Sequence, residues 1–187
     1  SSLLNLQSAS IKDPVVTQLF RECQVRITSI ALLHETLHRS NDLSRIKMGD
    51  YVRTLTGHLF RSYGVDPTVV ALELNVEDVE FDIDTGLTCG LIIDELVSNC
   101  LKHAFVDGSG GIVHIDLLDH LDETFTLCVS DNGIGISKDG VLNNPDSLGL
   151  ELVTLLAEKL DGSTELRSGA GTEWQIRFQQ LQYSERV

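Results

Sequence analysis

Polar side chains recur four residues apart within an apolar stretch of the chain. Glu95 and Asn99 have this spacing, and Lys102 and His103 follow one turn later. Residues four apart project from one face of a helix. A carboxylate and an amide there suit Mg²⁺ that also holds phosphate groups, and Lys102 and His103 could meet phosphate oxygens. Solvated polar surface on a mostly buried helix is the alternative interpretation.

A second motif combines a carboxylate with two glycines. The run D-N-G-I-G-I at residues 131–136 directly follows a predicted strand. Because glycine has no Cβ, Gly133 and Gly135 let the backbone approach a flat ligand closely. Asp131, at the end of the strand, could accept a hydrogen bond from an exocyclic amine such as that of adenine. A D-N-G turn is also common in hairpins, so a plain turn is the alternative.

Two further glycine motifs follow along the chain. Gly149 opens a predicted helix, where free N–H groups and the positive end of the helix dipole favour phosphate. The run G-A-G-T at residues 169–172 is a turn that enters the last predicted strand. The hydroxyl of Thr172 would lie beside Asp131 if their two strands are neighbours. An ordinary helix cap and a tight hairpin are the alternatives.

The order of these four motifs closely resembles the nucleotide site of the gyrase, heat-shock chaperone, histidine kinase and mismatch-repair ATPase superfamily. The runs E-L-V-S-N-C-L-K-H-A-F, D-N-G-I-G-I, S-L-G-L-E-L-V and G-A-G-T-E-W look like the histidine kinase branch. The resemblance covers essentially the whole chain. It implies the ATP-binding catalytic region of a sensor histidine kinase, a transferase that phosphorylates a histidine for relay to a response regulator receiver domain in two-component signal transduction.

Other functions remain open on the same fold. An ATPase or an anti-sigma-type serine kinase is one alternative, and the predicted helical hairpin argues against both. A non-catalytic dimerisation module is another, and the intact Asn99 and Asp131 argue against it.

The resemblance also implies roles for individual residues, with ATP and Mg²⁺ as ligands. Glu95 would be catalytic, orienting or polarising the attacking group, and Asn99 would be the magnesium ligand. Asp131 would bind the adenine amine. The remaining residues implied to contact the nucleotide are Lys102, His103, Gly133, Gly135, Gly149, Leu150, Gly171 and Thr172.

The expected fold is α+β: a two-layer α/β sandwich of the Bergerat type, preceded by an α-helical hairpin. The order of elements is mixed, which favours helices on one face of a mixed sheet. The ATP-binding domain is expected at residues 43–187. Its helices are predicted near 49–63, 84–103 and 148–160, and its strands near 69–74, 111–118, 124–130, 163–167 and 172–179.

Residues 1–42 are predicted to be part of a dimerisation and phosphotransfer hairpin. Apolar residues repeat every three and four positions from Val15 to Leu37, as in a long amphipathic helix. The stripe is too long to cover itself, which predicts a homodimer through a four-helix bundle; packing on the protein's own α/β domain is the alternative. The short segment 137–146, without a phenylalanine box, resembles the subfamily with the second type of phosphoacceptor hairpin, typically found after PAS or GAF sensor domains.

The position of the phosphoacceptor histidine is a separate question. His34-Glu35 echoes a phosphoacceptor box, but it falls on the second predicted hairpin helix, whereas the subfamily's acceptor lies on the first. We therefore expect the acceptor just upstream of Ser1, and a chain that binds ATP without phosphorylating itself; His34 is the alternative acceptor. His38 follows His34 at i+4, but no third metal ligand is near in sequence.

Composition narrows the class of protein further. The net charge of −14, without a basic stripe, disfavours nucleic acid as a partner. No apolar run approaches the roughly 18 residues that a membrane span needs, and no signal peptide opens the sequence; a cytoplasmic location is expected. The cysteines lack a C-x-x-C spacing, and Cys89, Cys100 and Cys128 are predicted to be small core residues.

Overall fold

The computed structural model describes four segments of the chain and a few helical residues before them. The segments are 45–106, 109–120, 122–136 and 147–180. Val16, Ile27, Thr28 and Ala31 are helical, within the stretch where a long hairpin helix is predicted. The rest of the predicted hairpin, including His34 and His38, lies outside the described residues, as does segment 137–146.

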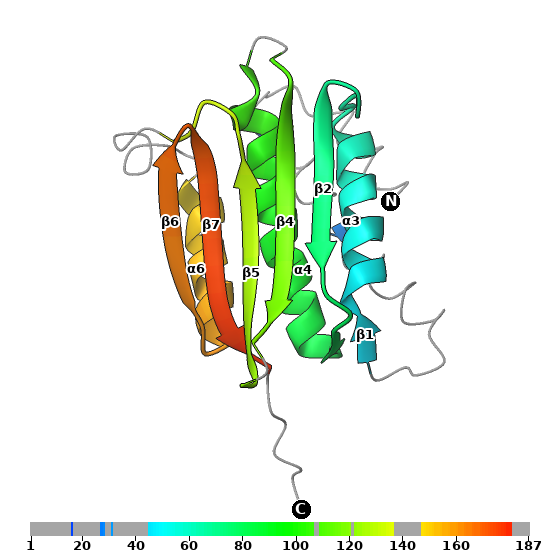
Figure 1. The fold of residues 1–187 in the computed structure, drawn as a ribbon, viewed down its shortest axis with the longest axis vertical. Coiled ribbons are helices and arrows are strands. Elements are labelled where there is room, and N and C mark those ends of the chain that lie inside the picture. Colours follow the sequence, from blue (N-terminus) through cyan, green and yellow to red (C-terminus); the bar gives the residue numbers. More distant parts are fainter. Residues whose placement is uncertain are drawn as a thin grey trace, which may run out of the picture.

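A five-stranded mixed sheet forms one layer of the fold (Figure 1). Its order is β2-β4-β5-β7-β6, with β2 parallel to β4 and every other neighbouring pair antiparallel. The strands are β2 (Val70–Val76), β4 (Gly111–Asp119), β5 (Thr124–Asp131), β6 (Ser163–Gly169) and β7 (Gly171–Gln179).

Three helices cover one face of this sheet and form the second layer (Figure 1). They are α3 (Met48–Ser62), α4 (Ile83–Asn99) and α6 (Ser147–Lys159). Helix α4 is central and packs against both α3 and α6. The predicted α+β, two-layer class is therefore confirmed for the described part of the chain, where no helix is long and apolar enough to cross a lipid bilayer.

Strict alternation along the strands separates the two faces of the sheet. In β4, Val113, Ile115 and Leu117 are fully buried, and the residues between them are only partly buried. Successive strand residues point to opposite faces, so the buried set faces the helices. Each such aliphatic side chain stabilises the fold by about 1.5–3 kcal/mol when it leaves water.

Local signals set where the helices begin and end. Helix α3 ends in a Schellman arrangement: Gly64 has φ +65°, and the N–H of Val65 donates to the carbonyl of Phe60 at 3.0 Å. Helix α4 begins with Asp82, whose Oδ1 accepts from the backbone N–H of Thr85 at 3.0 Å. An Asp side chain at this position satisfies a helix N–H that has no partner within the helix.

The structure differs from the sequence predictions in three respects: an additional small sheet, the end of one helix, and the burial of one cysteine. Strands β1 (Arg45–Lys47) and β3 (Glu80–Asp82) form a small antiparallel sheet that was not predicted, because three residues carry too little alternation to recognise. The predicted α-helix at 84–103 instead changes after α4 into a π-helix, η1 (Cys100–Ala104). The prediction of Cys128 as a core residue was wrong, because it is partly exposed on the polar face of β5.

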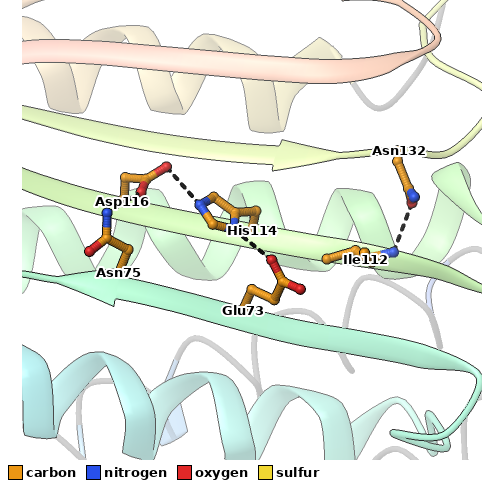
Figure 2. Close-up of polar contacts among 6 residues, drawn as sticks. All are labelled: Glu73, Asn75, Ile112, His114, Asp116 and Asn132. Atoms are coloured by element: carbon orange, nitrogen blue, oxygen red, sulfur yellow. Dashed lines mark hydrogen bonds and ion pairs between the residues drawn. The ribbon is translucent and has the colours of Figure 1, made fainter.

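The sheet face opposite the helices carries a polar cluster that ties the edge strand β2 to β4 (Figure 2). His114 Nδ1 lies 3.3 Å from Glu73 Oε2, and His114 Nε2 lies 3.0 Å from Asp116 Oδ2. Asn75 Nδ2 donates to Asp116 Oδ1 at 2.8 Å. These side chains are partly to largely exposed, and ion pairs in contact with water contribute at most about 1 kcal/mol.

Candidate functional site

The four sequence motifs meet at one end of the fold, the upper end in Figure 1. The C-terminal end of α4 lies there, and the chain continues into η1. Strand β5 ends there at Asp131, β7 begins there at Gly171, and α6 begins there at Ser147. Motifs far apart in the sequence therefore lie around the same end of the sheet, where β5 ends and β7 begins.

The acid and amide of the first motif lie on the last turns of α4. Glu95 is buried, with 8% of its surface exposed, and Asn99 is partly buried. Both carry oxygen atoms that a hard cation accepts as ligands. Among the described residues no group of three His, Cys, Asp or Glu side chains could hold a metal. An ion here would complete its coordination with oxygen atoms of a bound molecule and of water.

The first turn of α6 packs directly against Glu95. A Cβ on Gly149 would fall well inside 3.0 Å of Glu95 Oε1, a separation that real side chains do not adopt. Gly149 is itself buried, and Leu150 is partly buried. With glycine at this position, α6 begins directly beside the Glu95 carboxylate, so the third motif contacts the first.

Lys102 and His103 of the first motif lie on η1. His103 is exposed, whereas Lys102 is partly buried. Lys102 Nζ lies 6.0 Å from the centroid of the Tyr63 ring at the end of α3, within reach of a cation–π contact. Both residues lie at the end of the fold where the four motifs meet, so they could bind an anionic ligand there.

Asp131 is the carboxylate at the end of β5, and only 9% of its surface is exposed. Its Oδ1 accepts from the backbone N–H of Gly133 at 2.9 Å, and its Oδ2 accepts from the thiol of Cys100 at 3.5 Å. Strands β5 and β7 are neighbours, and Thr172 is the residue opposite Asp131 in their register. The second and fourth motifs thus contribute a carboxylate and a hydroxyl-bearing residue side by side.

The glycine loop after Asp131 is held on both sides. The N–H of Ile134 donates to the carbonyl of Ala104 at 3.0 Å, on the last residue of η1. On the other side, the N–H of Ile136 donates to Ser168 Oγ at 2.9 Å, and that hydroxyl donates back to the Ile136 carbonyl at 2.9 Å. The loop therefore bridges η1 and the β6–β7 hairpin.

Where this bridge meets the β6–β7 hairpin, glycine is required at two points. Gly135 has φ +72°, and a Cβ there would approach the carbonyl oxygens of Gly169 at 2.7 Å and Gly171 at 3.0 Å. Gly171 has φ +114°, and a Cβ there would fall on the carbonyl oxygen of Asp131. Backbone packs on backbone at both points, so the glycines define the shape of the site.

Two residues at the site were missed by sequence reasoning. Asn132 joins β5 to β4, because its Oδ1 accepts from the N–H of Ile112 at 2.7 Å (Figure 2). Cys100 contacts Asp131 through its side chain, although it was predicted only as a core residue. No spacing in the sequence indicates either contact, since both join residues from different elements.

Comparisons with known proteins agree with this arrangement. A family model described as histidine kinase-, DNA gyrase B-, and HSP90-like ATPase matches residues 86–182, a range that includes all four motifs. A second model, described as histidine kinase, matches residues 1–63. Both matches confirm the resemblance inferred from the motifs.

Individual relatives are sensor kinases of greater length. The chain is 28% identical over 181 residues to the sensor histidine kinase PdtaS of Mycobacterium tuberculosis, covering 95% of this chain and 36% of that protein. It is 31% identical over 105 residues to the blue-light-activated histidine kinase 2 of Erythrobacter litoralis, covering 54% of this chain and 30% of that protein. The chain thus spans about a third of the length of these curated relatives.

Solved structures share the fold. The histidine kinase domain of the Erythrobacter litoralis EL346 blue-light-activated histidine kinase superposes with a TM-score of 0.76 at 23% identity, covering 96% of this chain and 83% of that one. The mycobacterial sensor histidine kinase MprB gives 0.58 at 17% identity, covering 73% and 96%. At these identities the likeness concerns the fold alone.

Proposed function

Because the chain belongs to the histidine kinase-, DNA gyrase B- and HSP90-like ATPase family, we propose that it is the ATP-binding catalytic region of a sensor histidine kinase. The observation that carries this proposal is that four motifs meet at one end of the sheet, around the buried carboxylate of Asp131. Residues 43–187 form the ATP-binding domain, and residues 1–42 belong to the dimerisation and phosphotransfer hairpin.

The adenine base binds beside Asp131. A carboxylate accepts from the exocyclic amine of adenine and has no donor for the corresponding carbonyl of guanine. Gly133 and Gly135 let the base lie close to the backbone, and Thr172, opposite Asp131, completes the pocket with Gly171. Because the carboxylate is buried, its hydrogen bond to the base is not shared with bulk water, which favours ATP over GTP.

The triphosphate lies between α4 with η1 and the start of α6. The backbone N–H groups of Gly149 and Leu150 belong to the first turn of α6, where unpaired donors and the helix dipole attract anions. Lys102 and His103 on η1 provide further phosphate contacts. Asn99 is the protein ligand of Mg²⁺, which neutralises phosphate charge when it is bound.

Phosphoryl transfer then requires mainly positioning. The phosphorus–nitrogen bond to the acceptor imidazole forms as the bond to the β,γ-bridging oxygen breaks, and ADP leaves. Glu95, held against Gly149, orients the attacking imidazole. The fixed site supplies the alignment, because the ATP-binding domain itself forms no covalent bond to the transferred group.

The whole protein acts as a homodimer in the cytoplasm. Val16 and Ile27 are 39% and 49% exposed on the helical stretch before the ATP-binding domain, and pairing of two hairpins would cover such apolar side chains. Its further partners are an upstream sensor domain of the PAS or GAF type and the receiver domain of a response regulator. Light scattering that gives a single-chain mass for the full-length protein would contradict the dimer.

Calorimetry of ATP binding tests the nucleotide site. Asp131→Asn keeps the size of the side chain but loses its charge, so it should weaken ATP binding about 10- to 150-fold. Asp116→Asn is the matched control, because Asp116 lies on the opposite face of the sheet in Figure 2 and should leave affinity unchanged. If GTP binds the parent protein as well as ATP does, Asp131 does not read the base.

A further inference from the structure

The carboxylate of Asp131 is held by protein donors at both of its oxygens. The backbone N–H of Gly133 donates to Oδ1 at 2.9 Å, and the thiol of Cys100 donates to Oδ2 at 3.5 Å. An aspartate carboxylate rotates easily about its last bond, so its orientation depends on its hydrogen-bond partners. Each oxygen can accept more than one hydrogen bond, which leaves acceptor positions for a ligand.

The Cys100 thiol remains protonated and is therefore a donor. Burial raises the pKa of this thiol well above its ordinary value of 9.0, and the charge of Asp131 raises it further. Only 8% of Cys100 is exposed, so water does not compete for Asp131 from this side. In this pair the protonated thiol must be the hydrogen-bond donor, because the carboxylate accepts and does not donate.

Cys100 lies where α4 passes into the π-helix η1, of which it is the first residue and Ala104 the last. The wider i→i+5 turn changes the direction of the side chains that follow Cys100 relative to a continued α-helix. At its end, the carbonyl of Ala104 accepts from Ile134 at 3.0 Å. The same turn thus holds the carboxylate of Asp131 and the glycine loop that follows it.

We propose that Cys100 is a positioning residue for adenine recognition, which fixes Asp131 in the orientation that accepts from the 6-amino group of the base. The proposal rests on the ATP site proposed above and adds a specificity determinant to it. Cys100→Ala leaves Oδ2 without its thiol donor, so the carboxylate can turn away from the base. Cys100→Ser keeps a donor on a side chain of nearly the same size, since an O–H group is a stronger donor than a thiol.

The test compares two nucleotides in four proteins by calorimetry. ATP carries the 6-amino group, and the triphosphate of purine riboside lacks it. Cys100→Ala should reduce the preference for ATP about three- to tenfold, the usual range for loss of one hydrogen bond. Cys100→Ser should keep most of the preference. Cys89→Ala is the matched control, because Cys89 is another buried thiol, lies on α4, and has no hydrogen bond to Asp131 among those of the described residues.

The outcomes separate this proposal from the proposed function. A parent that binds ATP with a clear preference, together with an unchanged preference in Cys100→Ala, overturns the role of Cys100 alone. Equal losses in Cys100→Ala and Cys100→Ser also overturn it, because packing rather than donation would then be responsible. A parent that binds neither nucleotide overturns the ATP site and this inference with it.

Discussion

Replacing Gly171 with alanine should destabilise the junction between β7 and Asp131. The new Cβ would fall well inside 3.0 Å of the Asp131 carbonyl oxygen and at 3.0 Å from Asn132 Cα. Both are backbone atoms, so neither can rotate away. Overpacking costs about 1–3 kcal/mol, and forcing a residue with a side chain to φ +114° costs about 1–3 kcal/mol more.

The expected loss for Gly171→Ala is therefore about 2–6 kcal/mol in the free energy of unfolding. For a protein of this size that corresponds to roughly 4–24 °C in Tm. Urea unfolding followed by circular dichroism measures it. Gly169→Ala is the matched control in the same turn: a Cβ at Gly169 meets nothing within 4 Å, and its φ is not positive. If the two variants are equally stable, the reasoning about this junction is wrong.

Three other perturbations have defined outcomes. Tyr51→Phe should leave stability unchanged or raise it by up to about 1 kcal/mol, because the buried Tyr51 hydroxyl has no hydrogen-bond partner among the described residues; a lower Tm would contradict this. Burial alone would raise the pKa of Asp82, but hydrogen bonds from Thr85 leave this pKa below its ordinary value of 3.8. The stability from its carboxylate is thus present above that value and lost as pH falls through the folded pKa, so urea unfolding of Asp82→Asn should depend less on pH in the acid range than that of the parent. Asn99→Ala should weaken binding of Mg·ATP more than binding of metal-free ATP, and equal losses in calorimetry would exclude Asn99 as the magnesium ligand.

The main elements could be predicted because their signals are local. Alternating apolar residues in β4 are read directly from the sequence, since a half-buried strand requires them. Gly64 marks the end of α3, because few other residues adopt φ +65° without strain. The four motifs could be recognised because chemistry limits which residues serve at each position, and their order along the chain is specific.

The remaining features depend on contacts between distant segments. The strands β1 and β3 gain their pairing from each other and carry no periodic pattern of their own. The change from α4 into η1 leaves no trace in apolar spacing, because Cys100 and Ala104 are small residues that an α-helix would also accept. The contact between Cys100 and Asp131 requires both η1 and β5 to be in place. Neither residue type nor spacing predicts it.

Labelling of the full-length protein with ATP radioactive at the γ-phosphate tests the proposed kinase activity most directly. We expect label on the protein that is lost in acid, is stable in alkali, and requires Asp131. Phosphohistidine has this stability, whereas phosphoserine is stable in acid. Steady release of phosphate without protein label, or acid-stable label on serine, would instead identify an ATPase or a serine kinase and contradict the proposed function.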